Sequence, residues 1–79
     1  MARKASVIIE KDEHGFYVWC PELKGCQSQG DSLEEAISNI KEVIGLYLET
    51  VPENERDALL SQEILTTSVE VNAQSSTLD

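Results

Sequence analysis

Two cysteines and a single histidine are the residues of this chain best suited to metal binding or nucleophilic chemistry. Five residues separate Cys20 from Cys26, and His14 precedes them in a predicted turn. A structural zinc site uses four nitrogen or sulfur ligands, usually with closely spaced cysteine pairs. Two thiols and one distant imidazole do not meet that requirement. We therefore expect no metal and no cofactor, with Cys20 acting as a small hydrophobic residue of the core.

Catalysis by a thiol or by carboxylates is the next possibility. A thiol nucleophile needs a positioned base, and His14, the sole imidazole, lies at a hairpin tip. A metal-dependent nuclease needs acids that project from neighbouring strands into one pocket. The residues therefore favour a binding protein that is not an enzyme and has no catalytic residues. The acids of this chain lie elsewhere. The predicted hairpin turn carries Glu10, Asp12 and Glu13, and the solvent-exposed face of the predicted helix carries Glu34, Glu35 and Glu42.

The charge balance narrows the class of partner. The 79 residues include 6 basic and 15 acidic side chains, for a net charge of -9. Nucleic acid is a poor ligand for such a chain, because phosphate binding needs clustered Lys and Arg. A basic protein fits better, since complementary fields speed encounter. The alternative that the charge serves only solubility stays open.

No membrane or secretion signal is expected. The apolar stretch of the basic start "MARKASVII" is short and ends at Glu10 and Lys11, which is not typical of a signal peptide. Nothing approaches the ~20 apolar residues of a membrane span. We expect a cytoplasmic protein with reduced thiols.

The segment "ASVIIEKDEHGFYVWC" predicts a β-hairpin. Both arms are rich in Val, Ile and aromatic residues, and "DEHG" supplies an Asp and a Gly suited to a turn. Successive side chains of a strand point to opposite faces, so both faces of this sheet are apolar and one helix can cover only one of them. One face of the second arm carries Phe16, Val18 and Cys20, and the other carries Tyr17 and Trp19.

A long helix packed on one face of the sheet is expected after Ser32. The preceding "GCQSQ" is typical of a third, short strand. Ser32 is a suitable N-cap, and Glu35 completes a capping box. Hydrophobic residues then recur at spacings of three and four, which indicates a one-sided helix. This stripe consists of Leu33, Ala36, Ile37, Ile40, Ile44, Tyr47, Leu48 and Val51.

The C-terminal third predicts a second helix and a last strand. Pro52 ends the long helix or begins a short one over "PENERDALLSQ". The β-branched, alternating "ILTTSVEV", residues 64–71, predicts a strand. The expected fold is therefore α+β, a small antiparallel sheet of three to four strands with one long helix on one face (β-β-β-α-β). We expect a single domain over residues 1–72 and a flexible polar tail over 73–79.

Tyr17 and Trp19 indicate an interface. Half-exposed aromatic residues on one sheet face are enriched in protein contacts. The pair either meets a partner or is covered by the C-terminal segment of its own chain. A contiguous apolar patch usually marks a contact, and a closed two-fold dimer is the commonest solution. We expect a homodimer, or a dimer of dimers. Tyr17 and Trp19 are then buried in the dimer interface or beneath the C-terminal strand of the second subunit.

The stretch "DEHGFYVWCPELKGCQSQGDSLEEAISNIKEVIGLYLE" resembles the core of the HicB family of antitoxins. The shared pattern is an acidic turn with Gly, an aromatic strand, P-x-L-x-G-C, G-D-[ST]-x-E-E-A and N-I-K-E-x-I. The resemblance covers residues 7 to about 49. Two positions depart from the pattern. Lys24 replaces a second proline, and Trp19 replaces a smaller residue.

The resemblance implies a partial RNase H-like fold without nuclease activity. It also implies neutralisation of a HicA-like toxin, a small basic mRNA-cleaving protein. Full-length family members usually carry a C-terminal DNA-binding module, but after Val51 Arg56 is the one basic residue, so DNA binding is not expected. The alternatives are a degenerate RNase H-like nuclease and an orphan oligomeric protein-binding module. The expected partner-binding residues are Tyr17, Trp19, Asp31, Glu34, Glu35 and Glu42.

Overall fold

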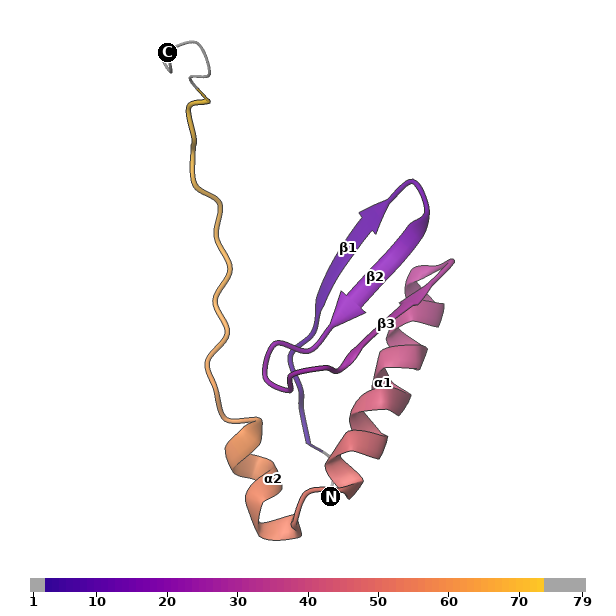
Figure 1. The fold of residues 1–79 in the computed structure, drawn as a ribbon, viewed down its shortest axis with the longest axis vertical. Helices are drawn as coiled ribbons and strands as arrows, with labels where there is room; N and C mark the ends of the chain where they lie inside the picture. Colours follow the sequence, from indigo (N-terminus) through magenta and orange to yellow (C-terminus); the bar gives the residue numbers. More distant parts are fainter. Residues whose placement is uncertain (1–2, 74–79) are drawn as a thin grey trace.

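A three-stranded antiparallel sheet with one long helix on one side forms the body of the protein (Figure 1). The structure is a computed structural model that describes residues 3–73. The strand order is β1-β2-β3, and the predicted α+β class with three strands and a long helix is confirmed. In chain order the elements are β1 (Ile8–Asp12), β2 (Gly15–Trp19), β3 (Gln27–Gly30), α1 (Leu33–Glu49) and α2 (Glu53–Leu59).

The predicted hairpin forms with a tight turn. In the register of β1 and β2, Ile8 lies opposite Trp19 and Asp12 lies opposite Gly15. The turn is held by Asp12, whose Oδ1 accepts a hydrogen bond from the His14 backbone amide at 2.8 Å. Gly15 has φ of 131°, a conformation open to glycine at little steric cost. The acidic turn is thus built from its own side chains.

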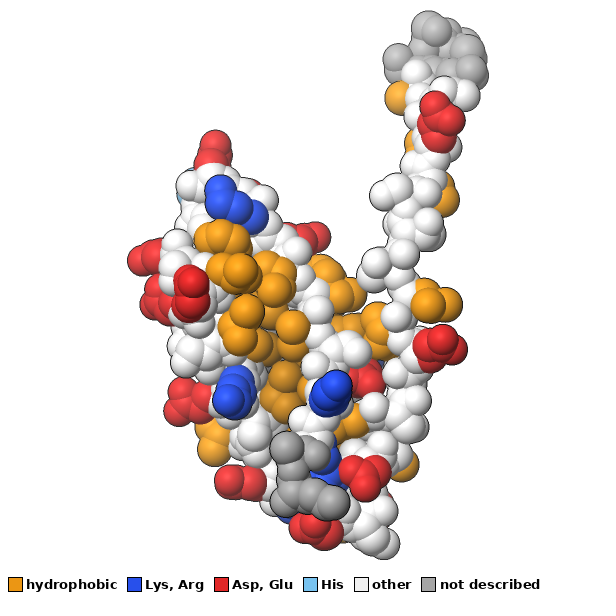
Figure 2. Space-filling view, turned by 180° about the vertical axis from the view of Figure 1, so that it is seen from behind, with side chains coloured by type: hydrophobic (Ala, Val, Ile, Leu, Met, Phe, Trp, Pro, Cys, Tyr) orange, Lys and Arg blue, Asp and Glu red, His pale blue; other side chains and the backbone are white. Residues whose placement is uncertain are grey.

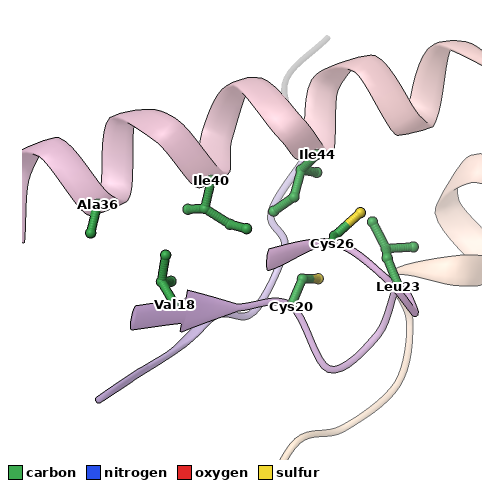
Figure 3. Close-up of a cluster of buried hydrophobic side chains, with 7 residues drawn as sticks. All are labelled: Val18, Cys20, Leu23, Cys26, Ala36, Ile40 and Ile44. Atoms are coloured by element: carbon green, nitrogen blue, oxygen red, sulfur yellow. The ribbon is translucent and has the colours of Figure 1, made fainter. Parts of the chain in front are cut away.

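The hydrophobic core lies between α1 and the sheet, as Figure 3 shows. The helix contacts β3 and β2, and Val18 points to it from the centre of the sheet. The two layers approach closely at Gly30, where an added Cβ would lie 2.6 Å from the Ala36 backbone nitrogen. The predicted helix-facing side of β2 is confirmed. Of the predicted helical stripe, Ala36, Ile40 and Ile44 are buried, whereas Leu33, Ile37 and Tyr47 are 41%, 42% and 38% exposed. The buried core residues are Val18, Cys20, Leu23, Cys26, Ala36, Ile40 and Ile44.

The loop between β2 and β3 closes on itself and joins the core. The Cys20 amide donates to the Cys26 carbonyl oxygen at 2.9 Å, and Leu23 fills the loop with 1% of its surface exposed. Both cysteines are free and buried. Glu22 is also buried, and its Oε1 accepts the Ser6 amide at 2.9 Å. This hydrogen bond fixes the segment before β1 to the loop.

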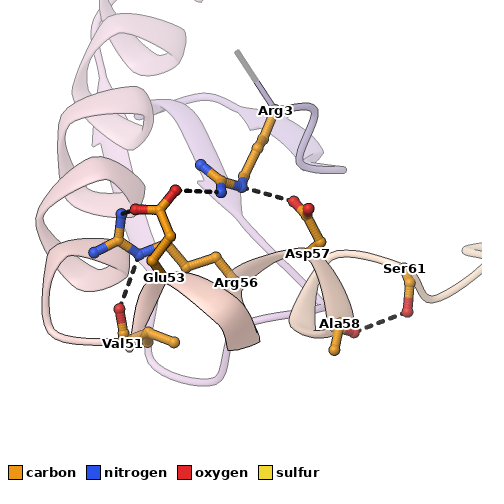
Figure 4. Close-up of polar contacts among 7 residues, drawn as sticks. All are labelled: Arg3, Val51, Glu53, Arg56, Asp57, Ala58 and Ser61. Carbon is orange, nitrogen blue, oxygen red and sulfur yellow. Dashed lines mark hydrogen bonds and ion pairs between the residues drawn. The ribbon is translucent and has the colours of Figure 1, made fainter. Parts of the chain in front are cut away.

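Helix α2 is held against the N-terminal segment by charged side chains, drawn in Figure 4. Arg3 donates through Nε to Asp57 at 2.7 Å and through Nη2 to Glu53 at 3.2 Å. Both contacts raise the pKa of the Arg3 guanidinium, and the hydrogen bond to Asp57 has the larger effect. Arg56 donates to the Val51 carbonyl oxygen at 2.8 Å. The second predicted helix is therefore present, but it is short and lies at the margin of the body.

The last predicted strand is wrong for this chain taken by itself. Residues 61–73 form neither helix nor strand, and Figure 1 shows this segment running apart from the sheet. The side chains of Leu65 and Val69 are 82% and 78% exposed. An alternating pattern makes a segment suited to a sheet, but a strand also needs an edge to pair with. Of the predicted tail over 73–79, all but residue 73 lies outside the described residues.

No helix within the described residues is both long enough and apolar enough to cross a membrane.

Candidate protein-binding surface

An open, acidic hollow of about 800 Å³ lies where the hairpin tip, the end of β3 and the start of α1 meet. It is lined by four carboxylates and contains neither Lys nor Arg. Tyr17 and His14 line it as well. Such a surface attracts a cationic group and repels an anionic one. The carboxylates are Glu10, Asp12, Asp31 and Glu35.

The capping box of α1 fixes one wall of this hollow. The Ser32 Oγ accepts the Glu35 amide at 3.1 Å, and Glu35 Oε1 in turn accepts the Asp31 amide at 2.9 Å. This reciprocal pair satisfies one free amide of the first helical turn and the amide of the residue before the N-cap. Asp12 is held in the same way on the opposite wall by the amide of His14. The acids are therefore positioned before any partner arrives.

The aromatic pair lies on the sheet face opposite α1. The ring centroids of Tyr17 and Trp19 are 5.4 Å apart, with the ring planes tilted by 32°. The Tyr17 hydroxyl donates to Gln27 Oε1 at 2.7 Å, and 38% of the residue is exposed. Paired rings with one polar tip are suited to a contact that is partly apolar and partly hydrated.

The structure brings together only some of the predicted partner-binding residues. Tyr17, Asp31 and Glu35 line the acidic hollow. Trp19 lines a second, neighbouring hollow together with Lys24. The remaining two predicted residues, Glu34 and Glu42, are exposed on α1 and line neither hollow.

Two of the four lining carboxylates were not predicted as partner-binding. Glu10 and Asp12 were interpreted only as acids of a hairpin turn. The cross-strand register places Glu10 opposite Tyr17, so both side chains emerge on the same face of the sheet. The alternation of β1 could have indicated this neighbour, because Glu10 and Asp12 are two residues apart.

Metal-ion and thiol chemistry can be examined separately among the described residues. Within residues 3–73, no group of three or more His, Cys, Asp or Glu side chains is arranged to hold a metal ion. Burial raises the pKa of the Cys26 thiol, and the nearby Cys20 adds to the shift, which disfavours the reactive thiolate.

Comparison with protein families identifies a match over most of the chain. Residues 5–76 match the family described as the HicB-like antitoxin of bacterial toxin–antitoxin systems. The matched span includes all three strands and both helices.

Individual relatives share the same region. A UPF0150 protein of Helicobacter pylori is 44% identical over 84% of this chain and 92% of its own length. A UPF0150 protein of Synechocystis, ssr1765, is 53% identical over 58% of this chain and 60% of its own length. A UPF0150 protein of Archaeoglobus fulgidus is 51% identical over 58% of this chain and 68% of its own length. No solved structure gives a significant match.

Proposed function

The chain belongs to the HicB-like antitoxins of bacterial toxin–antitoxin systems, and we propose that it binds and neutralises a small basic HicA-like toxin that cleaves mRNA. The acidic hollow on a chain with this family match is the observation that carries the proposal. A toxin of this kind holds RNA phosphates with cationic side chains. Carboxylates compete with phosphates for the same cations.

In the proposed complex, the four carboxylates of the hollow face the toxin's RNA-binding cations. Tyr17 and Trp19 supply the apolar anchor beside them, since aromatic residues often dominate binding energy at interfaces. Glu34 and Glu42 lie outside the hollow on α1, where their charges steer the approach of a basic partner. In this proposal, four of the six predicted partner-binding residues contact the toxin, and the other two, Glu34 and Glu42, act through long-range attraction.

Inhibition by occupation requires no chemistry from this protein. Family membership is consistent with a protein that is not an enzyme. We therefore propose that the purified chain cleaves neither RNA, DNA nor their hybrid in the presence of magnesium or manganese. Reproducible cleavage that a single carboxylate substitution abolishes would instead support a degenerate RNase H-like nuclease. The proposal also includes the partial RNase H-like relationship of the sheet and α1, a cytoplasmic location, and a homodimer or dimer of dimers.

The decisive experiment measures inhibition of a purified HicA-like toxin on a model RNA. Wild-type protein should stop cleavage at a stoichiometric ratio. Asp12→Asn with Asp31→Asn removes two charges from the hollow but keeps oxygen acceptors for the turn, so inhibition should weaken at least about tenfold. The matched control, Glu49→Gln with Glu55→Gln, removes two charges elsewhere and should inhibit as wild type does. Equal loss in both variants would show that net charge alone matters, and no inhibition by wild type would reject the proposal.

A further inference from the structure

Residues 64–71, here called the C-terminal segment, have the pattern of a strand but no sheet to join. Leu65, Val69 and Val71 occupy alternate positions with Thr67, and Thr66, Ser68 and Glu70 lie between them, so a strand made from this segment has one largely apolar side. Its hydrophobic side chains are nevertheless among the most exposed of the described residues, with Val71 at 77%. A segment with this composition is unstable as an isolated strand in water and is completed by pairing.

The sheet has one open edge to receive a strand. The order β1-β2-β3 leaves β1 and β3 as the two edges. At β3, the Asn39 side chain from α1 donates to the Gln29 carbonyl oxygen at 2.8 Å, so the helix already occupies part of that edge. Among the described residues, no side chain makes such a hydrogen bond to the backbone of residues 8–11. The β1 edge is therefore the better acceptor of a further strand.

An uncovered apolar strip lies beside β1 on the helix-facing side of the sheet. Ile9 pairs with the buried Val18 and so points to that side, yet 37% of it is exposed. On α1, Ile37 is 42% exposed next to the buried Ala36. Figure 2 shows hydrophobic side chains gathered into a continuous strip on this face of the molecule. The apolar side of an added strand would extend the strip and shield it.

The C-terminal segment lies away from the sheet of its own chain. The radius of gyration is 16.7 Å, against roughly 12 Å for a compact chain of this length. No hydrogen bond joins residues 62–73 to the chain's own sheet. We propose that the C-terminal segment of one chain adds as a strand to the β1 edge of a second copy, and that the second copy reciprocates. In a two-fold exchange, the β1 edge of each copy is paired with the C-terminal segment of the other, so the assembly is closed.

This inference assigns a contact to the homodimer proposed above, and it is independent of toxin binding. The test uses two full-length variants with the same charge change in the same segment. Leu65→Asp with Val69→Asp alters the apolar side, and Thr66→Asp with Ser68→Asp alters the other side. Sedimentation across a concentration series gives the dimer dissociation constant. Hydrogen exchange of the β1 amides reports whether that edge is paired.

Wild-type protein should be a dimer with slowly exchanging amides on the outer edge of β1. The Leu65/Val69 variant should raise the dissociation constant at least about a hundredfold, because two buried aliphatic side chains per chain are replaced by charges. Both variants should keep a folded sheet, since the altered side chains are exposed in the single chain. A monomeric wild type, equal effects of the two variants, or a dimer that resists the Leu65/Val69 change would each overturn the proposal.

Discussion

The backbone amide of Cys20 bonds to the carbonyl oxygen of Cys26 at 2.9 Å, so the loop that leaves the sheet is closed by its two ends. Both side chains are part of the core, with 2% and 3% of their surfaces exposed. Their five-residue separation thus spans a closed loop. Because both side chains are buried, reagents in solution have little access to either thiol.

Alkylation tests this burial directly. In the folded protein, Cys20 and Cys26 should react with iodoacetamide at least about a hundredfold more slowly than in denaturant, because reaction requires opening of the structure. Mass spectrometry of timed samples gives the rate at each thiol. Rapid modification of either cysteine in native buffer would contradict its placement in the core.

Stability should fall at alkaline pH because of Cys26. Burial raises the pKa of this thiol above its usual value of 9.0, so the folded state holds the proton more tightly than the unfolded chain. The resulting stability is present below the unfolded pKa and is lost as pH rises through the folded pKa. Denaturant unfolding at pH 7 and pH 10 should show a decrease. The decrease should be smaller in Cys26→Ala, and an unchanged pH dependence in that variant would assign the effect to other groups.

Two glycines should respond to alanine in opposite directions. A Cβ on Gly30 would lie 2.6 Å from the Ala36 nitrogen, so Gly30→Ala should separate β3 from α1 and destabilise the fold by about 1–3 kcal/mol. Gly45 lies within α1, and a Cβ there has nothing within 4 Å. Gly45→Ala should stabilise by about 0.5–1 kcal/mol through helix propensity. Urea unfolding measures both, and destabilisation by Gly45→Ala would point to a contact at that site.

Toxin association should depend on salt and on charges outside the hollow. Glu34→Lys with Glu42→Lys reverses two exposed charges on α1 and should lower the association rate more than it raises the dissociation rate. Rates measured at 50 and 500 mM salt should converge for wild type and variant as screening shortens. Affinity independent of salt would favour an apolar interface centred on Tyr17 and Trp19.

Trp19 is the single tryptophan, so its fluorescence reports one site. If the aromatic pair anchors the toxin, emission should shift to shorter wavelength on binding as water leaves the ring. Trp19→Phe retains an aromatic anchor but removes the signal, whereas Trp19→Ser should weaken binding by about 2 kcal/mol or more. Full affinity in Trp19→Ser would remove the pair from the proposed interface.

Local sequence patterns were sufficient to predict the three strands and the long helix. Alternation set the faces of β2, with Val18 inward and Tyr17 outward, because a strand side chain can point only to one side or the other. The capping box at Ser32 and Glu35 fixed the start of α1 for the same local reason, since its hydrogen bonds span only four residues. The expectation that Cys20 is a small hydrophobic residue of the core is confirmed, since 2% of its surface is exposed.

Tertiary structure decided how distant segments meet. The alternating pattern of residues 64–71 led to a predicted strand that the structure does not form, because a strand also needs an edge to pair with. The acidic hollow likewise joins Asp12 from the hairpin to Asp31 before α1, although neither residue's neighbours in sequence indicate the other. Local periodicity specifies what a segment can do, whereas pairing is a property of two surfaces and follows only once the chain is folded.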